Sequence, residues 1–104
     1  MPVFGDLEQA VMDVLWASPA AMSVRDVQAA LAHDRELAYT TVMTVMDRLA
    51  KKQQLQRELA GRAWKYRPTY SWAELACNEI MLLLATGPAD QRRAVLDAVS
   101  QRVG

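Results

Sequence analysis

The chain has 104 residues, of which 52% are apolar and 23% are charged, with equal numbers of basic and acidic side chains. This composition is typical of a small globular protein and excludes a disordered or collagen-like one. The longest apolar run, residues 80–85, is much shorter than the about 20 residues that cross a bilayer, so no membrane partner is expected. Acidic Asp6 near the start and the lone Cys77 favour a cytoplasmic protein without a secretory signal or an internal disulfide.

The charges are unevenly distributed along this neutral chain. Residues 38–68 contain seven basic and two acidic side chains, whereas residues 1–37 contain two basic and six acidic ones. A basic segment in a neutral chain indicates a polyanionic partner for that segment. The alternative is a solvated helix face next to an exposed hairpin, because charged surfaces are common.

Two helices are predicted first. Asp6 is placed to cap the first helix, with Gln9 three residues later as its reciprocal partner. Helical spacing predicts one buried face, formed by Leu7, Ala10, Val11, Val14 and Leu15. Pro19 ends this helix, and Ser23 forms a capping box with Asp26 at the start of the second. The apolar stripe of the second helix consists of Val24, Val27, Ala30 and Leu31.

The third helix, predicted from Tyr39 to Gln53, is amphipathic. Its apolar stripe consists of Val42, Val45, Met46 and Leu49. The opposite side carries Thr40, Thr44, Asp47 and Lys51, with Thr41, Met43 and Arg48 on its flanks. One face is therefore expected in the core, and the other offers hydroxyl groups and cations.

The periodicity then changes from helix to strand. Two strands are predicted at Leu55–Leu59 and Ala63–Arg67, joined by a turn with a basic tip. Side chains alternate between the faces of a strand, which places Trp64 and Tyr66 on one face and Lys65 on the other. Large aromatic side chains are usually buried, so we expect the three tryptophans in the core: Trp16, Trp64 and Trp72.

Two C-terminal helices complete the prediction. A fourth helix begins after Ser71, whose capping partner is Glu74, and a fifth runs from Ala89 to Val103. The fourth helix is apolar on nearly every side, and such a helix must be buried on every side. A second copy of the chain would bury it; the alternative is that the fifth helix folds back over it. The residues expected at the dimer interface are Trp72, Leu75, Ile80, Leu83, Leu84, Val95 and Val99. The expected division is a winged-helix domain at 1–69 and a dimerisation region at 70–104.

Three helices followed by a two-stranded hairpin are the element order of a winged helix-turn-helix, a mainly α fold with a small β-hairpin wing. A helix with a polar, cationic face fits the major groove of double-stranded DNA, so sequence-specific DNA binding is the favoured function. The residues expected at the DNA are Tyr39, Thr40, Thr41, Met43, Thr44, Arg48, Lys51, Lys52, Arg62 and Lys65. The alternative is a winged helix that binds proteins and not nucleic acid, and the salt dependence of binding separates the two.

Three blocks of the sequence carry a family resemblance: residues 5–16 (GDLEQAVMDVLW), 38–49 (AYTTVMTVMDRL) and 61–68 (GRAWKYRP). In this order they resemble the opening helix, the recognition helix and the wing of the penicillinase-repressor family, the BlaI/MecI/CopY group. The resemblance implies a homodimeric repressor acting on a palindromic operator, with an N-terminal winged helix and C-terminal dimerising helices. It also implies that the residues at the DNA face include Thr40, Thr41, Thr44 and Arg48. Met43 stands where some members carry a basic residue, so their base preference is not carried over.

The chain departs from the family pattern elsewhere as well. Gln53 and Gln54 stand where many members have a glycine suited to a left-handed helix cap. The single phenylalanine, Phe4, excludes the C-terminal Asn–Phe bond at which sensor-linked members are cleaved. The lone Cys77 cannot reproduce the paired cysteines of the copper-responsive members. The resemblance therefore carries over no small-molecule or metal effector.

No enzyme is expected. The chain has one histidine, His33, among charged residues at a helix end, and one cysteine, Cys77, in an apolar helix. A zinc site needs about four ligands at suitable spacing, and no such set occurs in the sequence. No catalytic residue, metal or cofactor is therefore predicted.

Overall fold

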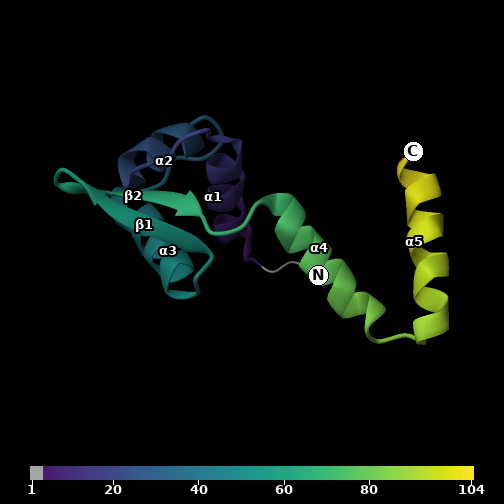
Figure 1. Cartoon of the computed structure of the whole chain (residues 1–104). Coiled ribbons are helices and arrows are strands. Elements are labelled where there is room, and N and C mark those ends of the chain that lie inside the picture. Colours follow the sequence, from purple (N-terminus) through teal and green to yellow (C-terminus); the bar gives the residue numbers. More distant parts are fainter. Residues whose placement is uncertain (1–3) are drawn as a thin grey trace. The chain divides into compact units, whose positions relative to one another are not determined.

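The computed structural model describes residues 4–104, which form five helices and one two-stranded hairpin (Figure 1). The sequence prediction of a mainly α fold with a small hairpin is confirmed. The chain divides into two compact units, and the division falls after Trp72, within the first turn of the fourth helix. The sequence prediction placed the boundary after residue 69.

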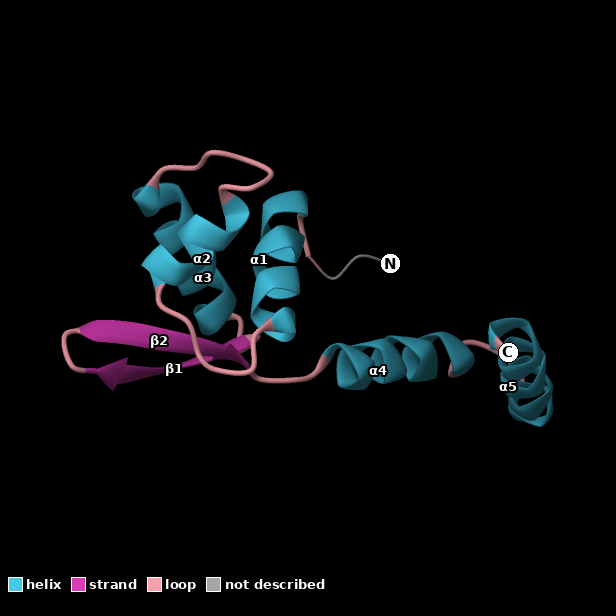
Figure 2. Cartoon of the chain, turned by 90° about the horizontal axis from the view of Figure 1, so that it is seen from above, coloured by secondary structure: helices cyan, strands magenta, loops and turns pink. Residues whose placement is uncertain are grey.

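The first unit holds the three N-terminal helices and the hairpin. Its elements are α1 (Asp6–Ala17), α2 (Val24–Leu31), α3 (Tyr39–Lys51), β1 (Leu55–Ala60) and β2 (Ala63–Pro68). The three helices lie on one side of the hairpin (Figure 2), where α3 contacts β1 and α2 contacts β2. The core therefore lies between the helices and the base of the hairpin.

The buried face of α1 differs from the predicted one. Glu8, Val11, Met12 and Leu15 are buried, whereas most of the predicted stripe is only half-buried. The face is rotated because α1 packs against α2, α3 and β2 together, and Met12 is fully buried. The stripes of the next two helices agree better with prediction, with a buried set of Val24, Val27, Leu31, Val42, Val45, Met46 and Leu49.

The N-termini of α1 and α2 are capped by different residue types. In α2 the prediction is confirmed, since the Asp26 amide donates to Ser23 Oγ and the Ser23 amide donates to the Asp26 carboxylate. In α1 the predicted cap at Asp6 is wrong by one residue. Gly5 is the N-cap, and its amide donates to the carboxylate of Glu8, which lies three residues later. Glu8 is held there by Lys52, the residue directly after α3, an interaction that local sequence does not reveal.

The end of α3 is a left-handed turn built without glycine. The helix ends at Lys51, and Gln53 has a φ of 64°. The Gln53 amide donates to the Ala50 carbonyl at 3.0 Å, and the Gln54 amide donates to the Leu49 carbonyl at 2.9 Å. These are the two hydrogen bonds of a Schellman motif, in which a glycine usually occupies the left-handed position. The turn into β1 is therefore kept despite the glutamine, at the cost of backbone strain.

Within the first unit, the hairpin is joined at Tyr66 to the segment that precedes α2. This residue is buried, and its backbone exchanges hydrogen bonds of 2.8 and 2.9 Å with Met22, just before α2. Leu55, at the start of β1, is buried as well. The base of the hairpin is thus part of the core, and its outer half extends beyond it.

The second unit contains most of α4 (Trp72–Leu84) and all of α5 (Ala89–Val103). Leu84 is its one buried side chain among the residues described. Large apolar side chains on both helices remain exposed, namely Trp72, Ile80, Met81, Leu82, Leu83, Val95, Leu96, Val99 and Val103. No helix within residues 4–104 is long and apolar enough to cross a membrane.

Replacement of Gln53 by Gly is expected to stabilise the protein by about 0.5–1 kcal/mol. A left-handed conformation costs a residue with a Cβ about 1–2 kcal/mol, and the greater unfolded-state freedom of glycine offsets part of the gain. Urea unfolding followed by circular dichroism measures the change. Gln53→Ala is the matched control and should give no comparable gain; equal stabilisation by Ala and Gly would show that the side chain and not the backbone is responsible.

Candidate nucleic-acid interface

The outward face of α3 is the face that the sequence predicted. Its inner side chains are buried, while the opposite side is exposed except at Asp47, which is half-buried. The exposed residues on this face and its flanks are Tyr39, Thr40, Thr41, Met43, Thr44, Arg48 and Lys51. Thr44 Oγ donates to the Thr40 carbonyl at 2.8 Å, so its lone pairs and its methyl group remain available at the surface. The helix presents a surface of hydroxyls, methyl groups and cations.

The wing brings a further cation close to this helix. Gly61 and Arg62 form the two-residue turn between paired Ala60 and Ala63, and Gly61 has a φ of 66°. Glycine at the first position of a two-residue hairpin supplies the positive φ that the turn requires. Arg62 is therefore presented at the exposed tip. A hollow lined by Tyr39, Met43, Arg62 and Trp64, among others, lies between the outer wing and the first turns of α3.

Trp64 is not in the core, in contrast to the prediction. Its side chain is 44% exposed, whereas Tyr66 on the same face of the hairpin is buried. The alternation along β2 was correct, but Trp64 lies nearer the tip, at a hollow that leaves its ring partly open to solvent. Its ring is instead covered by the guanidinium of Arg57, whose central carbon is 4.6 Å from the ring centroid. Trp72 is also exposed.

All three lysines predicted to contact DNA already have carboxylate partners. Lys51 Nζ lies 3.1 Å from Asp47 and Lys65 Nζ lies 3.4 Å from Asp26, and both of these pairs are exposed or half-exposed. Lys52 Nζ lies 3.0 Å from Glu8, whose side chain is only 10% exposed. Lys52 therefore fastens the end of α3 to the start of α1, a structural role that the sequence prediction missed.

The two arginines among the predicted DNA contacts differ from these lysines in their ion pairing. Within residues 4–104, neither Arg48 on α3 nor Arg62 at the wing tip has a carboxylate within ion-pair distance. Both side chains belong to exposed residues. The positive charge that is free to meet an external anion is therefore concentrated at these two positions.

Glu8 and Asp26 are the carboxylates that the local structure perturbs. Burial raises the pKa of Glu8, but the hydrogen bond from the Gly5 amide and the charges of Lys52 and Arg48 outweigh it, so the pKa is lowered from its ordinary value. The pKa of Asp26 is lowered by hydrogen bonds from the Ser23 amide and hydroxyl and then by Lys65. Both groups are therefore anionic at neutral pH and hold their cations in place.

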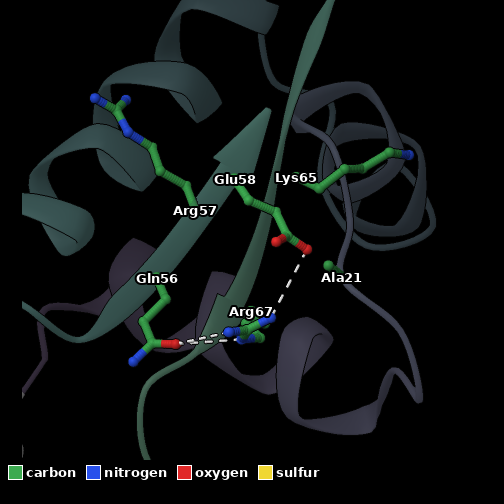
Figure 3. Close-up of a pocket in the computed structure, with 6 residues that line it drawn as sticks. All are labelled: Ala21, Gln56, Arg57, Glu58, Lys65 and Arg67. Atoms are coloured by element: carbon green, nitrogen blue, oxygen red, sulfur yellow. Dashed lines mark hydrogen bonds and ion pairs between the residues drawn. The ribbon is translucent and has the colours of Figure 1, made fainter. Parts of the chain in front are cut away.

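The opposite face of the hairpin is held by a different polar cluster (Figure 3). Arg67 donates through Nε and Nη2 to Gln56 Oε1 at 3.2 and 3.1 Å, and its Nη1 lies 3.8 Å from Glu58. Arg57 points away from this cluster. The two faces of the wing therefore use separate cations.

The sequence prediction missed two residues near the interface. Arg25, at the start of α2, lies over the Tyr39 ring with its guanidinium carbon 5.3 Å from the centroid. Arg57 contacts Trp64 and also lies 3.5 Å from the Asp47 carboxylate. Strand alternation could have placed Arg57 on the face of Trp64, but the pairing register needed for their contact comes from the structure.

The remaining candidate residues are the single cysteine and any group of metal ligands. Cys77 is an exposed free thiol on α4, although it lies in an apolar stretch of the sequence. Among the described residues, no group of three histidine, cysteine or acidic side chains is placed to hold a metal ion.

Three packed helices closed by a two-stranded wing, with the polar face of the third helix exposed, define a winged helix-turn-helix protein. The family model described as Penicillinase repressor matches residues 4–103, and the chain belongs to this family. The resemblance noted in the sequence is thereby confirmed.

Known relatives agree with this assignment. The transcriptional regulator BlaI of Mycobacterium tuberculosis is 44% identical over 101 residues, which are 96% of this chain and 73% of the relative. Two similar solved structures are 27% identical, and each match covers 70% of this chain and 88% of the other. They are the solution structure of the DNA-binding domain of the repressor BlaI, with a TM-score of 0.61, and that of monomeric Bacillus licheniformis BlaI in complex with the blaP half-operator, with a TM-score of 0.58. The family and these relatives are transcriptional regulators and not enzymes.

Replacement of Glu8 by Gln is expected to destabilise the protein by about 1–2 kcal/mol at pH 7, since the Gly5 amide and Lys52 lose a charged hydrogen-bond acceptor. The lowered pKa of Glu8 means that its contribution is present above its ordinary pKa of about 4.5 and disappears as the pH falls through the folded-state value. Urea unfolding from pH 7 to pH 3 should show the parent and Glu8→Gln converging below pH 4.5. A constant difference at every pH would contradict the assigned role, and Asp13→Asn on the exposed side of α1 is the control.

Proposed function

We propose that this protein is a cytoplasmic repressor that binds double-stranded DNA sequence-specifically, as a homodimer on a palindromic operator. The observation that carries the proposal is the exposed face of α3, where hydroxyl groups and Arg48, which has no carboxylate within ion-pair distance among residues 4–104, lie beside a basic wing tip. The relative from Bacillus licheniformis was solved with a half-operator, which supports the same role for this chain.

The first turns of α3 are placed to read bases. A single α-helix fits the major groove, where hydroxyl groups meet donors or acceptors on the base edges and methyl groups pack on thymine methyls. Thr40, Thr41 and Thr44 supply both kinds of group. Tyr39 and Met43 lie toward the wing and line the hollow beneath it, where they would contact the flank of the same groove.

Cations around this face would bind phosphates and fix the register without reading sequence. Arg48 and Arg62 would contribute most, because in the described part of the chain neither has a carboxylate within ion-pair distance. Lys51 and Lys65 would exchange weak surface pairs for phosphate contacts, at little cost. Lys52 would contribute least, since its release would leave a nearly buried carboxylate at Glu8 without its cation.

Replacement of both Arg48 and Lys51 by Ala is expected to weaken binding to every duplex and to reduce the salt dependence. The slope of log K against log salt falls by about 0.9 for each phosphate that the protein no longer neutralises, so the double variant should have a slope smaller by roughly one to two. Fluorescence anisotropy with the duplex upstream of the protein's own gene measures this. A protein-binding winged helix would show no such slope. An unchanged slope in the double variant would show that α3 does not contact the phosphates of the duplex.

Thr44→Val is the matched variant for sequence reading. It keeps the shape and the methyl group of threonine but replaces the hydroxyl with a second methyl, so it should lower the preference for the operator over random duplex while leaving the salt slope unchanged.

The exposed apolar side chains of the second unit would form the dimer interface. Leu83 is 71% exposed, and its neighbours Ile80, Val95 and Val99 line an apolar hollow between α4 and α5. Burial of one such side chain contributes about 1.5–3 kcal/mol, which favours coverage by a second copy. Trp72 and half-buried Leu75 would extend this surface. Leu84 is already buried within its own chain and would contribute less.

Two-fold symmetry would then place two α3 helices on successive turns of one face of the duplex. Half-sites read in this way lie about 34 Å apart or a multiple of that distance, and the operator mirrors the symmetry of the dimer.

Replacement of Leu83 by Glu is expected to produce monomers, because a charge in an apolar interface is left without a partner. Sedimentation velocity across a concentration series measures the change. Arg93→Glu, an exposed charge change on α5, is the control. A Leu83→Glu protein that stays dimeric would show that α4 is not in the interface.

A further inference from the structure

Arg57 joins the wing to α3 through contacts that the proposed DNA interface does not use. It lies opposite Tyr66 in the hairpin register, so its side chain is on the face that packs toward the helices. Its guanidinium covers the Trp64 ring, and its Nη1 lies 3.5 Å from Asp47 Oδ1 on α3. One side chain therefore contacts the recognition helix and the opposite strand at once.

The outer half of the wing has little else to hold it. From Glu58 to Trp64 every residue of the hairpin is exposed, including Leu59, which pairs with Trp64 across the strands. The hollow below this part is lined by residues of both α3 and the wing, so the two elements are not packed together there. The angle between the wing tip and α3 depends on the few interactions that cross from one to the other.

Asp47 is an acidic residue on a face proposed to meet phosphates. Its second carboxylate oxygen lies 3.1 Å from Lys51 Nζ, so the group is neutralised from both sides. Asp47 and Arg57 are 38% and 40% exposed, which shields their pair partly from water and salt. The carboxylate is thus placed to hold Arg57 rather than to contact DNA.

We propose that Arg57 is a positioning residue: by bridging Asp47 and Trp64 it holds the wing at the angle to α3 at which Arg62 and α3 contact one duplex together. This inference rests on the proposed DNA-binding function. It assigns Arg57 a role distinct from that of Arg62, the proposed phosphate-binding arginine of the same hairpin, although the two side chains have the same charge.

The test compares Arg57→Gln with Arg62→Gln on the duplex upstream of the protein's own gene, over a range of salt concentrations. Arg57→Gln loses the surface ion pair with Asp47 and the cation–π interaction with Trp64. From the usual strength of these two interactions we expect affinity to decrease roughly three- to tenfold, with an unchanged salt slope. Arg62→Gln should lower the slope by about 0.9. Arg57→Lys should retain most of the affinity, and in an Asp47→Asn background Arg57→Gln should have a much smaller effect. Circular dichroism melts check that each variant is folded.

Two results with DNA would overturn the inference. A slope lowered by Arg57→Gln as much as by Arg62→Gln would show direct phosphate contact, and an unchanged affinity would show that the bridge does not position the wing.

The free protein provides a readout that is independent of DNA. NMR residual dipolar couplings should show that Arg57→Gln reorients or loosens residues 58–64 relative to α3, and that Arg62→Gln does not. Unchanged couplings would overturn the positioning role. A parent protein that binds no duplex would refute the proposed function, while these couplings would still decide whether Arg57 positions the wing.

Discussion

The rest of the structure depends on the burial of one side of α3. Val42, Val45, Met46 and Leu49 are enclosed by α1, α2 and the base of the hairpin, and this packing leaves a single orientation for the helix. Because the helix repeats every 3.6 residues, burial of one face exposes the opposite one. The threonines and Arg48 are therefore exposed as a consequence of core packing. The orientation of the proposed base-reading face depends on this packing and on no further interaction of the exposed side chains themselves.

Ion pairs divide the cations of the basic segment into two groups. Lys52 is held by Glu8, a carboxylate kept anionic by the Gly5 amide and by the lysine itself. Arg57 is held by Asp47 and Trp64. Arg48 and Arg62, which have no such partners in the described part of the chain, remain for an external anion. The number of cations in a segment therefore overstates the charge available for binding, since some of them join elements of the fold.

The difference between local geometry and interactions that join distant residues explains which parts of the site could be predicted. Periodicity was sufficient to place the outward residues of α3 and the alternation of the hairpin, since both follow from local geometry. It could not show that Trp64 lies beyond the core, because that depends on how far the helices extend along the hairpin. It could not show the partners of Lys52 and Arg57 either, because each of these interactions joins residues that are distant in the sequence.

By itself the sequence determined the order of the elements, the polar and apolar faces of α2 and α3, and membership of a family of repressors, because these depend on local spacing and residue identity. Tertiary structure decided the rotation of α1, the capping of that helix by Glu8, and the left-handed Gln53 that turns the chain into the wing. It also decided which cations are paired. These features arise where separate elements meet, and no local pattern specifies the distance or the direction at which they do so.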